Sequence, residues 1–72
     1  MQAVSHELET FKVNYELDFY YLGPKEQDRY GLPDQTEVMK ARDIGDIYVQ
    51  LYRRFGKGLY GVKHVERLDF DK

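Results

Sequence analysis

The chain contains no cysteine and no tryptophan. Without cysteine, no disulfide can hold the fold together and no thiolate can act as nucleophile or metal ligand. This composition fits a reducing compartment, and we expect a cytoplasmic protein. No apolar run approaches the length that a membrane span needs, and the segment Met1–Phe11 lacks the apolar core of a secretory signal. A chain of 72 residues is therefore expected to form one domain around one small core.

Neither sign of charge dominates, because 13 acidic residues nearly balance 11 basic ones and the net charge is −2. Such a balance argues against a dedicated binder of duplex DNA. The charges are unevenly divided, however. Residues 1–37 hold 8 acids and 3 bases, whereas residues 38–72 hold 5 acids and 8 bases. A solvated surface that happens to cluster is the simpler interpretation, and a charged face for a partner is the alternative.

Three segments have the patterns of β-strands. Apolar and polar residues alternate over Phe11–Leu22, which predicts a strand with one face on a core and the other in water. Gly23 and Pro24 end it. A weaker alternation over Thr36–Ala41 predicts a short strand antiparallel to the first, and Tyr60–Phe70 predicts a third. Between the first two strands, residues 23–35 are predicted to be a long loop, and residues 1–9 a flexible N-terminal lead.

The segment Asp43–Phe55 has the pattern of an amphipathic helix. Asp43 is a suitable N-cap, Asp46 suits the first turn, and Gly56 follows the last turn. Apolar residues form one stripe at helical spacing between these signals: Ile44, Ile47, Tyr48, Leu51, Tyr52 and Phe55. In the strand that follows, the apolar residues Val62 and Val65 break the period of two, which indicates either a β-bulge or a strand with both faces partly covered.

Together these elements predict a small α+β domain over residues 10–72, with ββαβ order and a three-stranded sheet carrying one helix on one face. The last strand should run in the same direction as the second. The predicted core consists of Phe11, Val13, Tyr15, Leu17, Phe19, Val38, Ile44, Ile47, Tyr48, Leu51, Phe55, Val62, Val65 and Leu68.

Few residues have the pattern of a catalytic or metal site. The histidines are His6 and His64, and His64 with Asp18 or Glu16 is the candidate acid–base pair. A polar strand residue that faces water is the simpler interpretation. No histidine or cysteine spacing is typical of a metal site. We therefore expect a protein that is not an enzyme, with no catalytic residues, no metal, no cofactor and no small-molecule substrate.

Protein binding has broader support, because aromatic residues make up 15% of the chain and one small core cannot cover all of them. Tyrosine and arginine are enriched at interface hot spots, and the edges of a three-stranded sheet can pair with another strand, including that of a second copy. The sequence predicts a small regulator or accessory of a larger complex, compatible with a phage source, that binds through the open sheet face and the 23–35 loop. The predicted partner-binding residues are Tyr20, Tyr30, Leu32, Arg53, Arg54 and Tyr60. Single exposed aromatics around a small core are the competing interpretation.

The alternative function is an RNA-binding accessory, similar to a ribosomal protein. Cations could contact phosphate groups at the end of the helix and along the last strand, with Tyr60 available to stack on a base. The residues predicted for this function are Arg53, Arg54, Lys57, Lys63 and Arg67. Capping of the helix C-terminus by its arginines is the simpler interpretation.

The run T-E-V-M-K-A-R-D-I-G-D-I-Y-V-Q-L-Y-R-R-F-G, closed by Y-G-V-K-H-V-E-R-L-D-F, resembles a group of very small ββαβ proteins. These include the archaeal ribosomal LX protein, the epsilon subunit of Firmicutes RNA polymerase and a phage inhibitor of bacterial RNA polymerase. The resemblance covers about half of the chain and consists of a cap, a helix and a V-x-x-V strand. It implies a non-enzymatic accessory that docks on a large polymerase or nucleoprotein complex.

Overall fold

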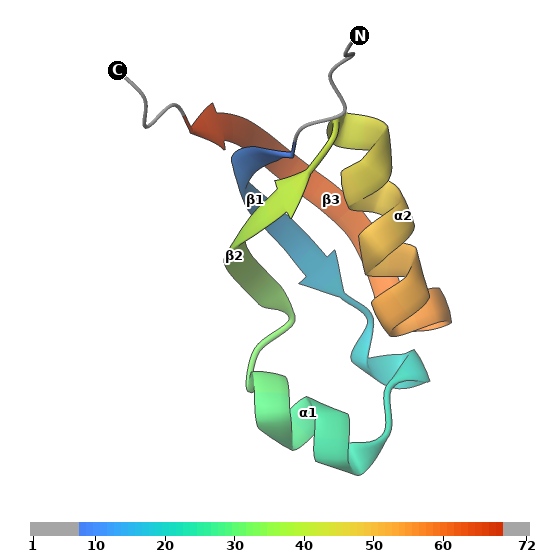
Figure 1. Cartoon of the computed structure of the whole chain (residues 1–72). Helices are drawn as coiled ribbons and strands as arrows, with labels where there is room; N and C mark the ends of the chain where they lie inside the picture. The colour runs from blue at the N-terminus through green and yellow to red at the C-terminus, as the bar shows by residue number, and fades with distance from the viewer. Residues whose placement is uncertain (1–7, 69–72) are drawn as a thin grey trace, which may run out of the picture.

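The computed structural model describes residues 8–68. Figure 1 shows the order of its elements: β1 (Glu9–Leu17), the 3-10 turn η1 (Phe19–Tyr21), α1 (Pro24–Tyr30), β2 (Asp34–Ala41), α2 (Ile44–Phe55), the 3-10 turn η2 (Gly56–Gly58) and β3 (Leu59–Leu68). The predictions for His6, for Phe70 and for most of the lead at 1–9 lie outside the described residues. Within them, Glu9 already belongs to β1.

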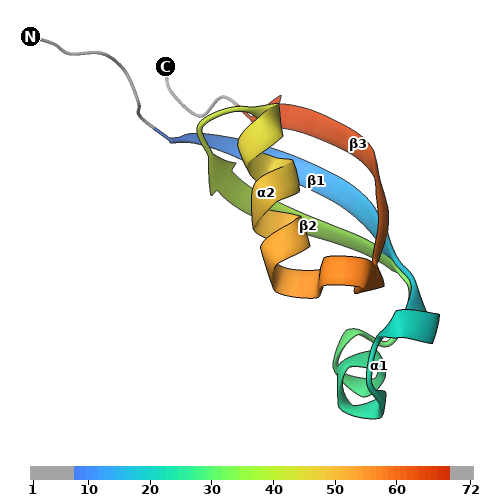
Figure 2. The ribbon, with the colours of Figure 1, turned by 90° about the vertical axis from the view of Figure 1, so that its right-hand side faces the viewer.

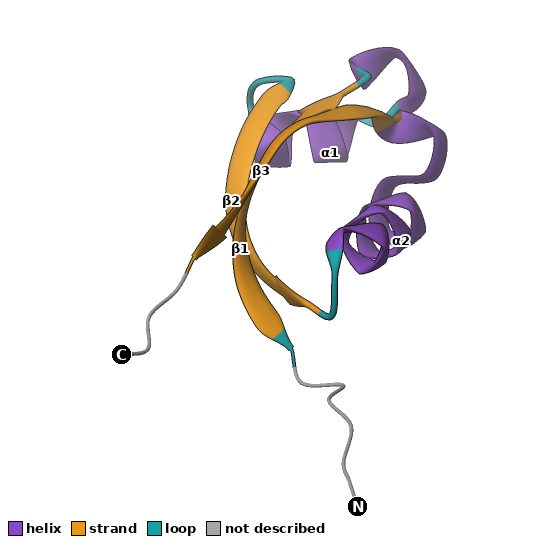
Figure 3. Cartoon of the chain, turned by 90° about the horizontal axis from the view of Figure 1, so that it is seen from above, coloured by secondary structure: helices purple, strands orange, loops and turns teal. Residues whose placement is uncertain are grey.

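The three strands form one sheet in the order β2-β1-β3, and β1 pairs antiparallel with both neighbours. β2 and β3 therefore run in the same direction, as the sequence predicted. Figures 2 and 3 show α2 lying on one face of this curved sheet, while no helix of residues 8–68 covers the other face. The α+β class and the ββαβ arrangement are confirmed, with a second, short helix added.

The first strand is shorter than the alternation predicted, because β1 ends at Leu17 instead of Leu22. The side chain of Asp18 accepts a hydrogen bond from the Tyr20 amide at 3.1 Å and starts η1. A further bond of 2.7 Å joins the Asp18 amide to the Gly58 carbonyl. These bonds turn the chain out of the sheet after Leu17, although the alternation of residues in the sequence continues beyond it.

The segment 23–35 was predicted to be a loop, and it instead contains α1. Pro24 occupies the first turn, where its missing N–H costs nothing. Glu26 accepts a hydrogen bond from the Gly23 amide at 3.2 Å. The helix ends at Gly31, which adopts a φ of 80°. The prediction gave too much weight to proline and glycine as loop residues and too little to their places at the two ends of a helix.

The helix α2 begins and ends where its local signals predicted. The Asp43 carboxylate accepts a hydrogen bond from the Asp46 amide at 2.8 Å, and Asp46 in turn accepts one from the Arg42 amide at 3.0 Å. Gly56 ends the helix with a φ of 56°. The predicted bulge is also present, because the register of β1 and β3 shifts between Asn14 and Tyr15 and again between Glu16 and Leu17.

The core lies between α2 and the sheet. Seven of its predicted members are buried, namely Phe11, Val13, Tyr15, Leu17, Ile47, Leu51 and Phe55. Phe19, Val62 and Val65 are partly buried against them, and Leu68 is of intermediate exposure. Buried residues that the prediction omitted are Leu22, Met39, Ala41 and Leu59.

Three predicted core residues, Val38, Ile44 and Tyr48, are exposed. For Val38 the cause is the register of β2: Phe11 lies opposite Met39, which places Met39 on the helix face and Val38 on the open face. Ile44 and Tyr48 are exposed because α2 buries only the row Ile47, Leu51 and Phe55.

Candidate functional site

The helix α2 presents three parallel rows of side chains, each with members four residues apart. The middle row, Ile47, Leu51 and Phe55, is buried against the sheet. The second row, Asp46, Gln50 and Arg54, contacts β2 and the residue after it. The third row lies on the opposite side of the buried row and consists of Ile44, Tyr48 and Tyr52. We call this third row the tyrosine row.

The row facing β2 is held by an ion pair. Arg54 donates two hydrogen bonds to Glu37, of 2.9 and 3.1 Å, and the buried Tyr15 hydroxyl donates a third of 2.8 Å. The hydrogen bonds from Arg54 lower the pKa of Glu37, and pairing with Glu37 raises the pKa of Arg54. Burial, followed by the bond to Glu37, raises the pKa of Tyr15. This side of α2 is therefore committed to the fold.

The ion pair predicts a pH-dependent stability. Because the folded-state pKa of Glu37 lies below its ordinary value of 4.5, its contribution is complete above that pH and is lost as the pH falls through the folded value. Glu37→Gln should lower the free energy of unfolding by about 1 kcal/mol at pH 7, a modest effect because a third or more of each side chain is solvent-screened. Urea unfolding from pH 7 to pH 3 measures it. The gap between wild type and variant should shrink below pH 4.5; a gap that stays constant contradicts the prediction.

The tyrosine row, by contrast, is free of such bonds in the described residues. Ile44 is 51% exposed, Tyr48 42% and Tyr52 55%. Since the opposite row faces β2, the tyrosine row lies on the side of α2 nearer to β3. Half-exposed tyrosines in a row are the kind of residue that contributes most at protein interfaces.

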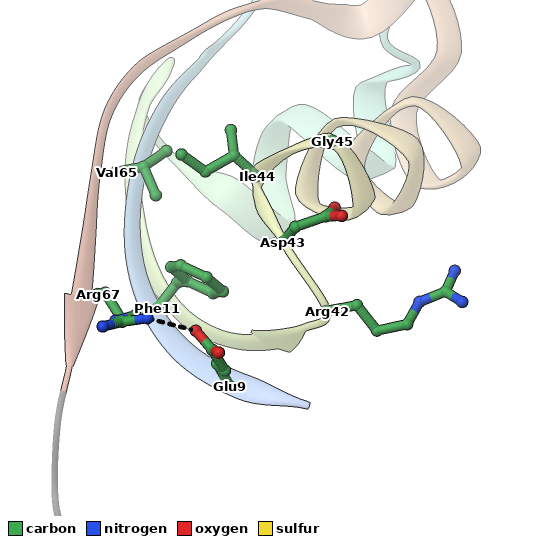
Figure 4. A pocket seen from close by; sticks show the side chains of 8 residues that line it. All are labelled: Glu9, Phe11, Arg42, Asp43, Ile44, Gly45, Val65 and Arg67. Atoms are coloured by element: carbon green, nitrogen blue, oxygen red, sulfur yellow. Dashed lines mark hydrogen bonds and ion pairs between the residues drawn. The ribbon is translucent and has the colours of Figure 1, made fainter. Parts of the chain in front are cut away.

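A pocket of about 730 Å³ opens at the end of this row, between the start of α2 and β3. In Figure 4, Ile44 of α2 and Val65 of β3 point toward one another, with Phe11 of β1 below them. Arg67 donates a hydrogen bond of 3.0 Å to Glu9 at the rim. The apolar part of the lining is therefore Phe11, Ile44 and Val65, and the charged part consists of Glu9, Arg42, Asp43 and Arg67. We call the tyrosine row and this pocket together the α2–β3 surface.

The open face of the sheet is polar and internally bonded. Asn14 in β1 donates a 3.0 Å hydrogen bond to Asp34 in β2, and Lys63 in β3 forms a 3.1 Å ion pair with the same oxygen. These bonds, from Asn14 first and then Lys63, lower the pKa of Asp34. Val38, which lies opposite Lys12, is an exposed large hydrophobic residue on this face. Hydrogen bonds thus join Asn14, Asp34 and Lys63 to one another across this face, whereas no described side chain forms such a bond with the tyrosine row.

The residues predicted to bind a partner come from several different elements of the chain. Tyr20 is 85% exposed on η1 and Leu32 is exposed after α1, whereas Tyr60 is 71% exposed at the start of β3. Tyr30 is half-buried and its ring lies 5.3 Å from that of Phe55. Arg53 is exposed on α2, but Arg54 is held by Glu37.

Three of the five cations predicted for RNA binding are already paired with carboxylates. Arg54, Lys63 and Arg67 each form an ion pair, with Glu37, Asp34 and Glu9 in that order. Within residues 8–68, Arg53 and Lys57 have no carboxylate at ion-pair distance. A phosphate-binding surface usually needs a larger cationic excess than two such residues provide.

The candidate acid–base residues are not brought together by the strand register. His64 lies opposite Asn14, whereas Glu16 lies opposite Gly61, and Asp18 caps η1. In the described part of the chain, no group of three or more histidine, aspartate or glutamate side chains could hold a metal ion. No helix among residues 8–68 is long and apolar enough to cross a membrane.

The sequence did not single out Ile44, Tyr48 and Tyr52 as a surface, because all three belong to one apolar stripe, and Ile44 and Tyr48 were predicted to be in the core. A signal was present in the width of the stripe. Six apolar residues over three turns form a broader face than one helix buries on a three-stranded sheet.

Comparison of the chain with protein-family models, with curated proteins and with solved structures finds no significant match. The resemblance to small ββαβ proteins therefore stays a prediction.

Proposed function

We propose that this chain is a small, non-enzymatic protein-binding module that acts as a regulator or accessory of a larger complex. The observation that carries this proposal is the α2–β3 surface, where an exposed apolar row lies next to an open pocket. Hydrogen bonds to β2 hold one side of α2 in place, so the position of the tyrosine row relative to the sheet is fixed. Burying the exposed part of two tyrosines would remove a large apolar area from water.

The RNA-binding alternative receives less support from the geometry, because three of its five cations are paired with carboxylates of the same chain. Its phosphate contacts would have to compete with those pairs, and the contribution of the remaining two cations would weaken further with salt.

The proposal is tested by capture of partners from a lysate of the source organism, with and without nuclease. Wild-type protein should retain a protein partner after nuclease treatment. The double variant Tyr48→Ala/Tyr52→Ala should retain at least tenfold less, since truncation of a hot-spot residue costs about 2 kcal/mol or more.

Tyr21→Ala is the matched control, because Tyr21 is 54% exposed, nearly the same fraction as Tyr52, and lies on η1 and not on α2. It should retain the partner at the wild-type level. Thermal unfolding of each variant checks that the fold is intact. Loss of every partner on nuclease treatment, or equal retention by the double variant and wild type, would refute protein binding through this surface.

A further inference from the structure

The two outer edges of the sheet differ in how their backbone groups are bonded. The Lys40 carbonyl of β2 accepts a hydrogen bond of 2.9 Å from the Gln50 side chain of α2. The amide of Arg42, the residue after β2, donates one of 3.0 Å to the Asp46 side chain of the same helix. In the described residues, no side chain hydrogen-bonds to the backbone of β3. The outer edge of β3 therefore offers unpaired amides and carbonyls.

Only part of this edge is regular. The register of β3 with β1 shifts twice in its first half, and then runs without a shift over His64–Leu68. A regular run of five residues can accept another strand, whereas bulges oppose such pairing. β3 also contains no proline, the residue that most directly blocks an edge.

The regular run lies beside the pocket. Val65 and Arg67 line the pocket from β3, and Ile44 lines it from α2. A strand added to His64–Leu68 would place the side chain opposite Val65 on the helix face, near Ile44. The same geometry would place the side chain opposite Arg67 at the charged rim, and the side chain opposite Glu66 on the open face.

We infer, as an extension that rests on the proposed function, that the partner contributes an extended segment. This segment pairs antiparallel with His64–Leu68 as a fourth strand. Charge complementarity defines its chemistry. An acidic residue fits opposite Arg67, whose guanidinium is exposed and has donors beyond the one bonded to Glu9. A basic residue fits opposite Glu66, and an apolar residue fits opposite Val65. Read from its N-terminus, the segment carries acidic, basic and apolar residues in that order.

A second copy of this chain fits the edge less well. Symmetric antiparallel pairing over all of His64–Leu68 would place the two Glu66 side chains directly opposite each other, and like charges in that position are destabilising. It would also place Arg67, and no apolar side chain, opposite Val65.

The test uses the blocked peptide acetyl-Val-Glu-Lys-Ile-Thr-amide, titrated into isotope-labelled full-length protein and followed by NMR. We expect shift changes confined to His64–Leu68 and to Ile44 and its neighbours. Antiparallel strands hydrogen-bond through alternate residues. Of the neighbouring Lys and Ile amides in the peptide, only one can therefore point toward β3. N-methylation of that amide should abolish binding, and N-methylation of the other, in a separate peptide, should preserve it.

A charge-reversal pair supplies the second readout. Arg67→Glu should weaken the peptide about fivefold, the upper range for one cross-strand pair, and a peptide with Lys in place of Glu should recover that loss. Binding that tolerates both N-methyl groups, or a peptide that produces no shifts at millimolar concentration, overturns strand addition. Either result leaves the proposed function standing if Tyr48→Ala/Tyr52→Ala still loses the captured partner. Concentration-dependent dimerisation through β3 would overturn the inference in favour of a second copy.

Discussion

Replacing Leu51 by alanine is expected to lower the free energy of unfolding by about 3 kcal/mol. Leu51 is fully buried at the centre of the row that α2 places on the sheet. The variant loses the transfer free energy of the removed carbon atoms and leaves a cavity that a close-packed core fills only partly. A chain of 72 residues has a total stability of about 4 to 11 kcal/mol, so this loss is a large fraction of it. Urea unfolding at neutral pH measures the change.

Val49→Ala is the matched control, because Val49 lies in the same helix but is 46% exposed. Its effect should stay within about 0.5 kcal/mol, and the better helix propensity of alanine favours the variant. Equal effects at the two positions would mean that α2 is not docked through the row of Ile47, Leu51 and Phe55.

Replacing Gly58 by alanine is expected to destabilise the fold by about 1 to 3 kcal/mol. A Cβ atom at this position would overlap Cδ2 of Leu22 and would lie 2.9 Å from its Cγ. Leu22 is itself buried, so it has little room to move. The contact joins the residue after η1 to η2, and the hydrogen bond between the Asp18 amide and the Gly58 carbonyl joins the residue before η1 to the same glycine. The substitution should therefore loosen the chain between β1 and α1 as well as the turn before β3.

Gly61→Ala provides the comparison, because a Cβ atom at Gly61 meets nothing within 4 Å and its φ is not positive. Thermal unfolding of the two variants side by side should show a lower midpoint for Gly58→Ala and almost no change for Gly61→Ala. A midpoint for Gly58→Ala at the wild-type value would show that Leu22 can move aside, and would contradict the close contact.

The prediction for Leu51 bears on function, because the proposed surface depends on the position of α2. Leu51 docks the helix, and the ion pair of Arg54 and Glu37 holds its other side to β2. With these contacts in place, the tyrosine row and the edge of β3 have a defined spacing. A partner segment would then bind a surface that is already formed, which reduces the entropy lost on binding.

The alternation in β2 was a weak guide to its burial. Val38 and Met39 are both apolar, and either face of Thr36–Ala41 could have met the core. The pairing of Phe11 with Met39 decides the question. That pairing is a contact between distant parts of the chain, and no local pattern contains it.

The sequence by itself determined the elements whose signals are local. The cap at Asp43, the stripe that follows it and the stop at Gly56 all act within a few residues of one another, and backbone hydrogen bonding and sterics need no distant partner there. The tertiary structure alone decided which part of the stripe is covered, because a three-stranded sheet has room for only one row of α2. It likewise decided that an α2 side chain hydrogen-bonds to the backbone of β2 while, within residues 8–68, none does so to the backbone of β3, since strand order and helix placement set which backbone groups find partners.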